Sequence, residues 1–308
     1  MSAVSARRFS DQPYLLLILT VLFWSGNWVV GRGLRGEVPP VALAFWRWSL
    51  AFACTLPGAW PYRHQAWPVL RAHWRLLGAL ALLGITGYNT LAYIGLQYTT
   101  ASNGVLLNAF IPIVILGLSL VFQGKGLSVL EACGVSISLA GVAVIVAQGD
   151  AERLLAMGFN PGDIWILISV FMWAAYTLLL QRRPRGLPPM LLLALLIMLG
   201  LLGLLPLYGW ELTQGRDIHW SSGAVLGIAY TGFFPAFLGY VFWNRAVAQV
   251  GGARAGLFIH LMPVATTLLS AVVLGEAPQL YHLAGMLLIV GGITLSTRRA
   301  HEHQVAAR

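Results

Sequence analysis

The sequence predicts an all-α integral membrane protein of ten transmembrane helices, built as two inverted five-helix repeats with both termini in the cytoplasm. Three observations predict this fold class: a composition too apolar for a water-soluble protein, apolar runs of membrane-spanning length, and an alignment of the second half of the chain with the first. The 308 residues are 58% hydrophobic and 9% charged, whereas soluble domains carry about 25% charged residues. We therefore expect a chain that lies in a bilayer for most of its length.

The apolar residues fall in runs long enough to cross a membrane. A helix needs about 20 apolar residues to span the hydrocarbon core, and only helices and closed barrels satisfy the backbone there. These runs are too long and too little alternating for barrel strands. The predicted spans are residues 13–31, 40–56, 74–96, 101–122, 127–147, 161–181, 188–210, 223–244, 253–274 and 280–296. The connections between them are short, so no soluble domain is expected.

The basic residues sort by side of the membrane. If the N-terminus is cytoplasmic, four of the 19 lysine and arginine residues (Arg32, Arg35, Arg153 and Arg216) lie outside, Arg47 lies within a span, and the other 14 lie inside. This bias predicts an N-in, C-in topology. The net charge of +9 is thus explained by the lipid bilayer as partner, and no nucleic acid is expected. Both a monomer and a homodimer are compatible with the sequence.

The second half of the chain aligns with the first. At a constant offset of 151, residues 98–142 align without a gap on residues 249–293, which pairs Pro112 with Pro263. The other identical pairs are Gly124 with Gly275, Gly134 with Gly285 and Gly141 with Gly292, and an offset of 149 pairs Trp24 with Trp173. Five spans therefore repeat as five.

Because five is odd, the second repeat enters the membrane from the opposite face. Such inverted repeats, related by a pseudo-two-fold axis in the membrane plane, are common in secondary transporters. We predict a first repeat over residues 1–150 and a second over residues 151–308. A duplication retained only for packing is the alternative interpretation.

Polar and aromatic side chains recur at helical spacing on single faces of several spans. Such groups are costly against lipid, so these faces are expected to point inward and line a central cavity. The candidate substrate-binding residues are Trp24, Asn27, Arg47, Asn89, Tyr93, Asn108, Trp173, Tyr176, Tyr240 and His260. The alternative for each is hydrogen bonding between helices without contact to a solute, and aromatic residues near span ends are also typical interfacial anchors.

Two of these candidates carry a basic group inside a span. Arg47 lies about 12 Å into its span from Pro39, at 1.5 Å per residue, and its planar fork suits the carboxylate of an amino or organic acid. The alternative is that it ties its helix to backbone carbonyls or tyrosine hydroxyls. His260 is interpreted either as a group that titrates near physiological pH or as a hydrogen-bonded core residue.

Small residues and prolines indicate how the spans pack and bend. Pro112 and Pro263 lack a backbone donor at aligned positions, so we predict kinks there that act as hinges or are static bends. Two stripes, Gly134, Ser138, Gly141 and Gly285, Ile289, Gly292, are expected to bring spans 5 and 10 close together. Residues 191–205 are entirely apolar and are expected to face lipid, and Cys54 and Cys133 are expected to be small core residues.

The signatures of enzymes and of ATP-driven machines are missing from the sequence. The Walker A motif is not present, since Lys125 lies in the run QGKG. His, Asp and Glu form no cluster with metal-ligand spacing, and the two cysteines lie on different spans. We therefore expect no enzymatic activity, no cofactor and no metal, and gradients as the energy source.

Short motifs distributed over nearly the whole chain together resemble the EamA-type branch of the drug/metabolite transporter superfamily. They are FWSGN at 23–27, FWR at 45–47, YN to GL at 88–96, ASN to IP at 101–112, WNRA at 243–246 and MP to GE at 262–276. The chain departs from the family at Gly124-Lys125, where the first repeat usually has Gly-Glu. Within the family, it is most similar to the aromatic amino-acid exporters of the YddG type.

The resemblance implies a secondary transporter in a bacterial inner membrane, working by alternating access. Its expected substrates are small molecules, namely amino acids, both aromatic and other neutral ones, or related metabolites, moved outward. A carrier for a phosphorylated or nucleotide-linked compound is an alternative, although a single buried arginine offers little charge for phosphate. A channel is the other alternative.

Overall fold

The computed structural model describes residues 12–124, 128–150, 160–266 and 279–306, together with residues 152 and 269. Every regular element in this part of the chain is helical, with no β-strand. The α-helices are α1 (Pro13–Gly33), α2 (Pro40–Ala59), α3 (Ala66–Ala81), α4 (Tyr88–Tyr98), α5 (Ala101–Asn108), α6 (Ile111–Gln123), α7 (Val129–Val146), α9 (Pro161–Leu180), α10 (Pro189–Thr213), α11 (Ser222–Thr231), α12 (Gly239–Val250), α13 (Gly252–Leu257) and α15 (Leu280–Ala306). Short 3₁₀ helices are η2 (Leu34–Gly36), η3 (Trp60–Gln65) and η6 (Phe258–Leu261), and π-helical turns are η4 (Leu82–Gly87) and η5 (Gly232–Leu238).

Six helical stretches in the described residues are long and apolar enough to cross a membrane. They are Pro13–Gly36, Pro40–Tyr98, Asn103–Phe122, Pro161–Leu180, Pro189–Thr213 and Ser222–Val250, and Val129–Ile145 and Leu280–Ser296 are shorter apolar helices. Helices thus lie where the sequence predicts spans, and the all-helical membrane class is confirmed. The number of spans and their orientation stay predictions, and the end of the predicted span 253–274 lies outside the described residues.

Several helices begin where local chemistry dictates. Pro13, Pro40, Pro161 and Pro189 stand at the first position of their helices, where the backbone N–H has no partner within the helix and proline costs nothing. The turn before α9 is held by a capping box, in which the Asn160 side chain and the carboxylate of the third helical residue each accept a backbone N–H. These signals are local, which explains why sequence predicts the helix starts well.

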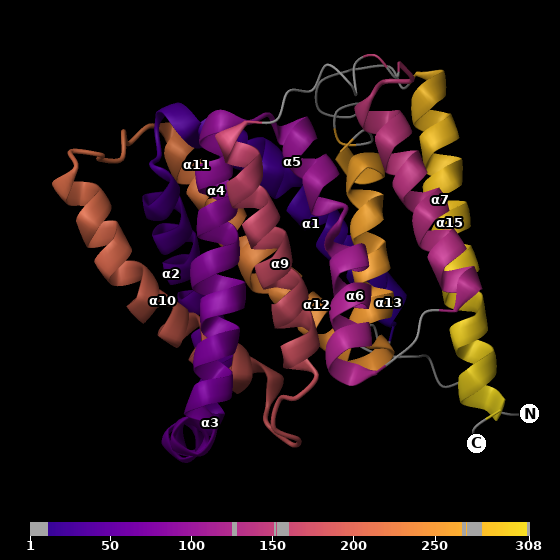
Figure 1. The fold of residues 1–308 in the computed structure, drawn as a ribbon. Coiled ribbons are helices and arrows are strands. Elements are labelled where there is room, and N and C mark those ends of the chain that lie inside the picture. Colours follow the sequence, from indigo (N-terminus) through magenta and orange to yellow (C-terminus); the bar gives the residue numbers. More distant parts are fainter. Residues whose placement is uncertain are drawn as a thin grey trace, which may run out of the picture.

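The helices form a bundle with one helix pair set apart at its edge (Figure 1). Helices α7 and α15 lie side by side at one edge, whereas α10 and α2 pack together at the opposite edge. Between them lie α1, α4, α9 and α12, with α1 against α12 and α4 against α9. The central four helices carry most of the predicted binding residues.

Helices α7 and α15 approach each other so closely that their backbones touch at glycines. A Cβ added to Gly292 would lie 2.4 Å from the Gly134 carbonyl oxygen, and one added to Gly141 would lie 2.7 Å from the Gly285 carbonyl oxygen. Real side chains do not tolerate such distances, so only glycine fits. The prediction that the small-residue stripes bring these two spans together is confirmed.

Two packing predictions were wrong. Residues Leu191 to Ile197 of α10 are buried, with relative exposures of at most 6%, because this half of the helix packs on α2 rather than on lipid alone. The uniformly apolar composition of this segment therefore did not show whether it contacts lipid or another helix. Cys133 is exposed and Cys54 is partly exposed, so neither is a core residue, since a thiol on a lipid-facing surface carries no polarity penalty that would drive it inward.

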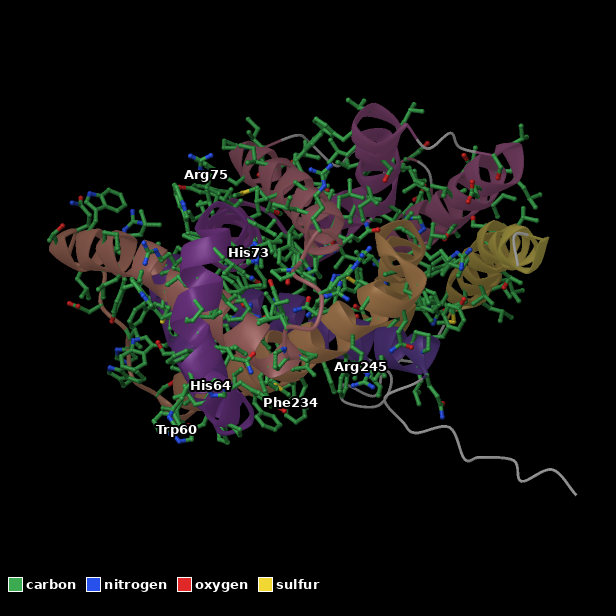
Figure 2. The ribbon with its side chains drawn as sticks, turned by 90° about the horizontal axis from the view of Figure 1, so that it is seen from below. Trp60, His64, His73, Arg75, Phe234 and Arg245 are labelled. Carbon is green, nitrogen blue, oxygen red and sulfur yellow. The ribbon has the colours of Figure 1, made fainter. Side chains whose placement is uncertain are left out.

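Basic residues gather at the end of the bundle where α3 begins. Gly84 lies against Tyr176 and Gly95 lies against Gly162, so α9 runs antiparallel to α4 and ends on this side. Arg182, Arg183 and Arg185 follow directly, and Figure 2, viewed from this side, includes Arg75 and Arg245. These described arginines, all predicted to be cytoplasmic, thus share one end of the bundle.

Candidate functional site

Two clusters of buried side chains meet among the central helices. We call one the Arg47 cluster, which consists of Asn27, Arg47, Asn89 and Tyr93. We call the other the aromatic cluster, which consists of Trp24, Trp48, Tyr88, Trp173, Tyr176, Tyr240 and Trp243. These side chains come from five helices, α1, α2, α4, α9 and α12, so the site depends on how the helices pack rather than on one segment.

Helical spacing aims these side chains at common points. Residues three or four positions apart share a helix face, which is the spacing of Asn89 and Tyr93 on α4 and of Tyr240 and Trp243 on α12. The same rule places Trp24 and Asn27 on one face of α1, and Trp173 and Tyr176 on one face of α9. Each face points inward because its polar atoms would be unsatisfied against lipid.

Arg47 is held by side-chain oxygens. Its Nη1 donates to Asn27 Oδ1 (3.2 Å), Asn89 Oδ1 (2.9 Å) and the Tyr93 hydroxyl, and that hydroxyl in turn donates to Asn27 Oδ1 (2.7 Å). Arg47 is 1% exposed, and its Nε is buried without an acceptor. One edge of the guanidinium is therefore anchored while its Nε–H is not bonded.

No carboxylate balances the Arg47 charge among the described residues. The positive charge is stabilised instead by amide and hydroxyl dipoles and by rings, since the guanidinium carbon lies 5.4 Å from the Trp48 ring centroid and 5.6 Å from that of Tyr93. A buried charge without a counter-ion is expensive, and such residues in a membrane protein often mark a ligand path. The site thus carries a positive charge that no described carboxylate neutralises.

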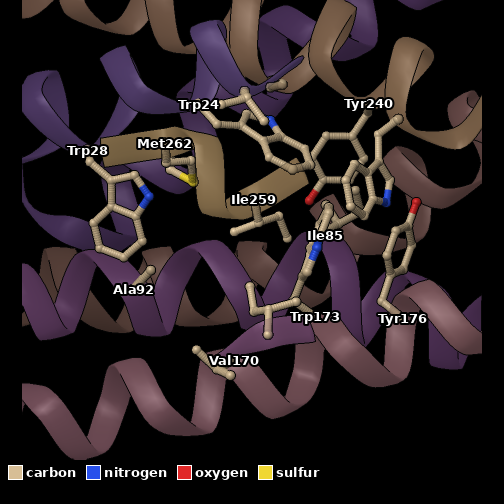
Figure 3. Close-up of a cluster of buried hydrophobic side chains, with 14 of the residues drawn as sticks. Trp24, Trp28, Ile85, Ala92, Val170, Trp173, Tyr176, Tyr240, Ile259 and Met262 are labelled. Carbon is tan, nitrogen blue, oxygen red and sulfur yellow. The ribbon is translucent and has the colours of Figure 1, made fainter. Parts of the chain in front are cut away.

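Trp173 is the centre of the aromatic cluster. Its ring centroid lies 5.0 Å from Trp24, 5.4 Å from Tyr240 and 5.6 Å from Trp243, and Figure 3 shows it beside Tyr176 and below Tyr240. Tyr88 and Tyr176 also contact it, at 4.7 and 5.1 Å. Tyr240 then links the cluster to Trp48 at 4.7 Å, next to Arg47. An apolar, aromatic wall is therefore continuous with a cationic group.

Two π-helical turns border the clusters. A π turn interrupts the regular i→i+4 bonding, and such turns occur frequently at functional sites. In η4, the Gly84 carbonyl accepts from Asn89 Nδ2 (3.4 Å) and from the Tyr240 hydroxyl. In η5, the Pro235 carbonyl accepts from Trp24 Nε1 (3.1 Å). Gly84 and Pro235 are 151 residues apart, the offset at which the sequence aligns with itself.

Two predicted site residues lie at or beyond the border of the clusters. Asn108 accepts from the Tyr88 hydroxyl (3.0 Å) and donates to Met262 Sδ (3.3 Å), so it adjoins the aromatic cluster. His260 bonds through Nδ1 to Ser138 Oγ (2.7 Å) and through Nε2 to the Ala109 carbonyl (2.8 Å). Both of its ring nitrogens are thus used to join helices, away from Arg47.

Pro112 and Pro263 both follow an interruption of a helix. Pro112 is the second residue of α6, after the turn at Ala109-Phe110 that ends α5, and Pro263 follows the 3₁₀ turn η6. Both prolines thus lie next to a break in regular α-helix, at aligned positions. Their role as hinges stays a prediction.

Residues that align between the two halves touch each other directly. Hydrogen bonds join Asn89 Nδ2 to the Tyr240 hydroxyl (3.2 Å), His260 to Ala109, and Ser138 Oγ to the Ile289 carbonyl (3.5 Å), and each of these pairs is 151 residues apart. Trp24 and Trp173, which are 149 residues apart, stack edge to face. Contacts between equivalent positions are expected where a two-fold axis passes.

The sequence analysis missed three members of the aromatic cluster as site residues: Trp48, Tyr88 and Trp243. Trp48 and Trp243 are completely buried, although tryptophan in a span is more often an interfacial anchor. The spacing of Trp243 three residues after Tyr240 was the available signal. No signal existed for the π turns, because they depend on tertiary contacts. Within the described ranges, no group of three metal-ligating side chains occurs.

Known proteins resemble the chain along most of its length. The sequence profile described as "EamA-like transporter family" matches twice, at residues 12–147 and 160–298. The uncharacterized transporter YyaM of Bacillus subtilis is 25% identical over 283 residues, 91% of this chain and 92% of that protein. An uncharacterized transporter of Archaeoglobus fulgidus is 28% identical over 297 residues, covering 95% and 100% of the two chains.

One relative carries a more specific name. A probable terminal-alkyne amino-acid exporter of Streptantibioticus cattleyicolor is 28% identical over 287 residues, 92% of each chain. A solved crystal structure superposes with a TM-score of 0.72 at 19% identity, covering 95% of this chain and 98% of the other, which shows a shared fold. With its apolar helices and two matches to one profile, the chain is a multi-pass membrane transporter and belongs to the EamA-like transporter family.

Proposed function

We propose that the protein exports amino acids, aromatic and other neutral ones, or closely related small metabolites, across a bacterial inner membrane by alternating access. The observation that carries this proposal is the junction of the Arg47 cluster with the aromatic cluster. A guanidinium suits a carboxylate, and the adjoining aromatic wall suits an apolar or aromatic side chain. A small amphipathic acid matches both.

The two halves of the chain are proposed to be inverted repeats of five spans, with both termini in the cytoplasm. The family profile matches once in each half, and aligned residues such as Asn89 and Tyr240 touch each other. The site lies where the halves meet, since Arg47 belongs to the first half and Trp173 to the second. Rocking of one half against the other would therefore open the site alternately to each side.

The substrate class is also supported by the Streptantibioticus relative, whose name is that of an amino-acid exporter. At 28% identity, that protein points to a class of substrate rather than to a compound. We expect an amino acid with a sizeable apolar side chain, because the aromatic cluster contains seven aromatic side chains and few polar acceptors.

Counterflow tests the proposal. Purified protein in proteoliposomes preloaded with a panel of aromatic and aliphatic amino acids should show saturable uptake of the labelled counterpart, which also separates a carrier from a channel. In the Arg47→Ala variant we expect the apparent affinity to fall about 10- to 100-fold, because a charge-assisted hydrogen bond is worth about 1.5–3 kcal/mol.

The matched control is Arg63→Ala, which removes an exposed arginine that contacts the Trp60 ring at 4.8 Å. Its exchange should equal that of the unmodified protein. Wild-type exchange by a folded Arg47→Ala protein would exclude the carboxylate role of Arg47. Absence of exchange with every amino acid, from protein whose melting transition proves that it is folded, would exclude this substrate class.

A further inference from the structure

The hydrogen-bond acceptors of the site are already used. Asn27 Oδ1 accepts from Arg47 and Tyr93, and Asn89 Oδ1 accepts from Arg47. Four other oxygens around the site also accept from protein groups. The Gly84 carbonyl accepts from Asn89 and Tyr240, the Pro235 carbonyl from Trp24, Asn108 Oδ1 from Tyr88, and Asn244 Oδ1 from Tyr176. A ligand that brings hydrogen-bond donors finds few oxygens to receive them.

The donors of the same site are in excess. Arg47 Nε and the indole nitrogens of Trp48, Trp173 and Trp243 are all buried without a protein acceptor. All four residues are at most 1% exposed. Buried N–H groups are rarely left unbonded, because their desolvation is not recovered. Four of them in one site therefore point to a ligand that supplies acceptors.

These four donors form one connected group. The Arg47 guanidinium lies 5.4 Å from the Trp48 ring, Tyr240 contacts both Trp48 and Trp173 at 4.7 and 5.4 Å, and Trp173 lies 5.6 Å from Trp243. Arg47 and Trp48 come from α2, whereas the other two come from α9 and α12. The four donors therefore come from three helices that belong to both halves of the chain.

The site offers no favourable place for an ammonium group among the described residues. The buried carboxylates lie elsewhere, since Asp163 bonds to Asn103 and Glu211 caps the start of α2. The Arg47 charge would in addition repel a second cation.

We infer that the site is selective for apolar monocarboxylates that carry no free α-ammonium group: aryl- or alkyl-alkanoates, 2-oxo acids and N-acylated amino acids. The carboxylate oxygens accept from Arg47 Nε and from the indole N–H groups, and the aromatic cluster contacts the apolar part. This inference rests on the proposed transport of carboxylates through this site, and it ranks compounds within that class. The parent amino acids are the weaker substrates.

Matched ligands test the ranking with the full chain in proteoliposomes. L-tryptophan, indole-3-propionate and tryptamine share one skeleton and differ only in the carboxylate and the ammonium group. N-acetyl-L-tryptophan replaces the ammonium by a neutral acetamide, and L-leucine with 4-methylpentanoate forms an aliphatic pair. Inhibition of counterflow and shifts in melting temperature give the affinities. We expect the ammonium-free acids to bind at least ten-fold more tightly than their amino acids, and tryptamine not to bind.

Each outcome is decisive. Tighter binding of the amino acids than of their ammonium-free partners overturns this inference but leaves amino-acid export intact. Binding of tryptamine but of no acid overturns both this inference and the carboxylate role of Arg47. Absence of binding by every compound, from folded protein, likewise overturns both.

Phenylalanine substitutions test the indole donors separately. Trp48→Phe and Trp173→Phe keep a ring but remove the N–H group, so each should lower the affinity for the ammonium-free acids three- to ten-fold. Trp67→Phe is the control, since Trp67 is 68% exposed on α3 and should behave as the unmodified protein. If folded Trp48→Phe and Trp173→Phe proteins keep the original affinities and ranking, the indole groups do not receive the carboxylate and the inference fails.

Discussion

Glu211 is a buried carboxylate at the end of α10 that caps another helix. Its oxygens accept from the backbone N–H groups of Val41 (3.1 Å) and Ala42 (2.7 Å) in the first turn of α2. These N–H groups have no partner within their own helix and carry partial positive charge, so a carboxylate stabilises them. Because α2 also carries Arg47, the cap fixes the start of the helix on which the Arg47 cluster depends.

His260 makes a testable contribution at the same scale. Its side chain joins Ser138 of α7 to the Ala109 carbonyl. His260→Ala therefore removes one hydrogen bond from each of these buried groups, although Ser138 keeps its bond to the Ile289 carbonyl. We expect the free energy of unfolding to fall by about 1–3 kcal/mol, seen as a lower melting temperature in detergent. His64→Ala, at an exposed histidine, should melt like the unmodified protein. A His260→Ala protein with unchanged melting would show that these bonds contribute nothing.

At the scale of elements, the closest packing is that of α7 on α15. These helices touch through backbone atoms at Gly134, Gly141, Gly285 and Gly292. In lipid, helices associate through close contact rather than through the hydrophobic effect, so each added methyl group must separate them. The pair is therefore a closely packed unit at the edge of the bundle, beside the helices that carry the site (Figure 1).

Neighbouring glycines of α15 provide a matched pair of variants. A Cβ at Gly292 would lie 2.4 Å from a backbone oxygen of α7, whereas one at Gly291 would meet nothing within 4 Å. Gly292→Ala should destabilise the protein by about 1–3 kcal/mol through overpacking. Gly291→Ala should be neutral or stabilising by up to about 1 kcal/mol, because alanine favours a helix. Thermal unfolding distinguishes them, and equal melting temperatures would contradict the close approach.

At the scale of the whole molecule, the two halves meet along a line of aligned residues. Trp24 with Trp173, Asn89 with Tyr240 and Ala109 with His260 are contacts between equivalent positions. The hydrogen bonding around this line is not symmetric, since the Trp24 indole donates to Pro235 while the Trp173 indole has no acceptor. The proposed alternating-access mechanism predicts such an asymmetry, because each of its two states opens the site to one side only.

The proposed orientation predicts which ends can be labelled from outside. Arg185 and Arg216 are exposed residues at opposite ends of α10. In a protein with Cys54 and Cys133 replaced by serine, Arg216→Cys should react with a membrane-impermeant maleimide added outside intact cells, and Arg185→Cys should react only after permeabilisation. This follows from the positive-inside rule. The reverse pattern would invert the topology.

Composition and residue spacing were sufficient to predict the helical membrane class, the positions of the described helices and the α7–α15 packing, and the resemblance of short motifs indicated the family. The spacing of polar residues also predicted most of the inward-facing side chains, because residues three or four positions apart share a helix face and a polar face turns away from lipid. The partners of those residues were decided only by tertiary structure. Arg47 hydrogen-bonds to residues 20, 42 and 46 positions away in the sequence. His260 hydrogen-bonds to Ser138 and does not join the Arg47 cluster. Such contacts depend on how whole helices are rotated and how far apart they lie. The π turns and the burial of α10 depend on the same arrangement, so no local sequence pattern predicts them.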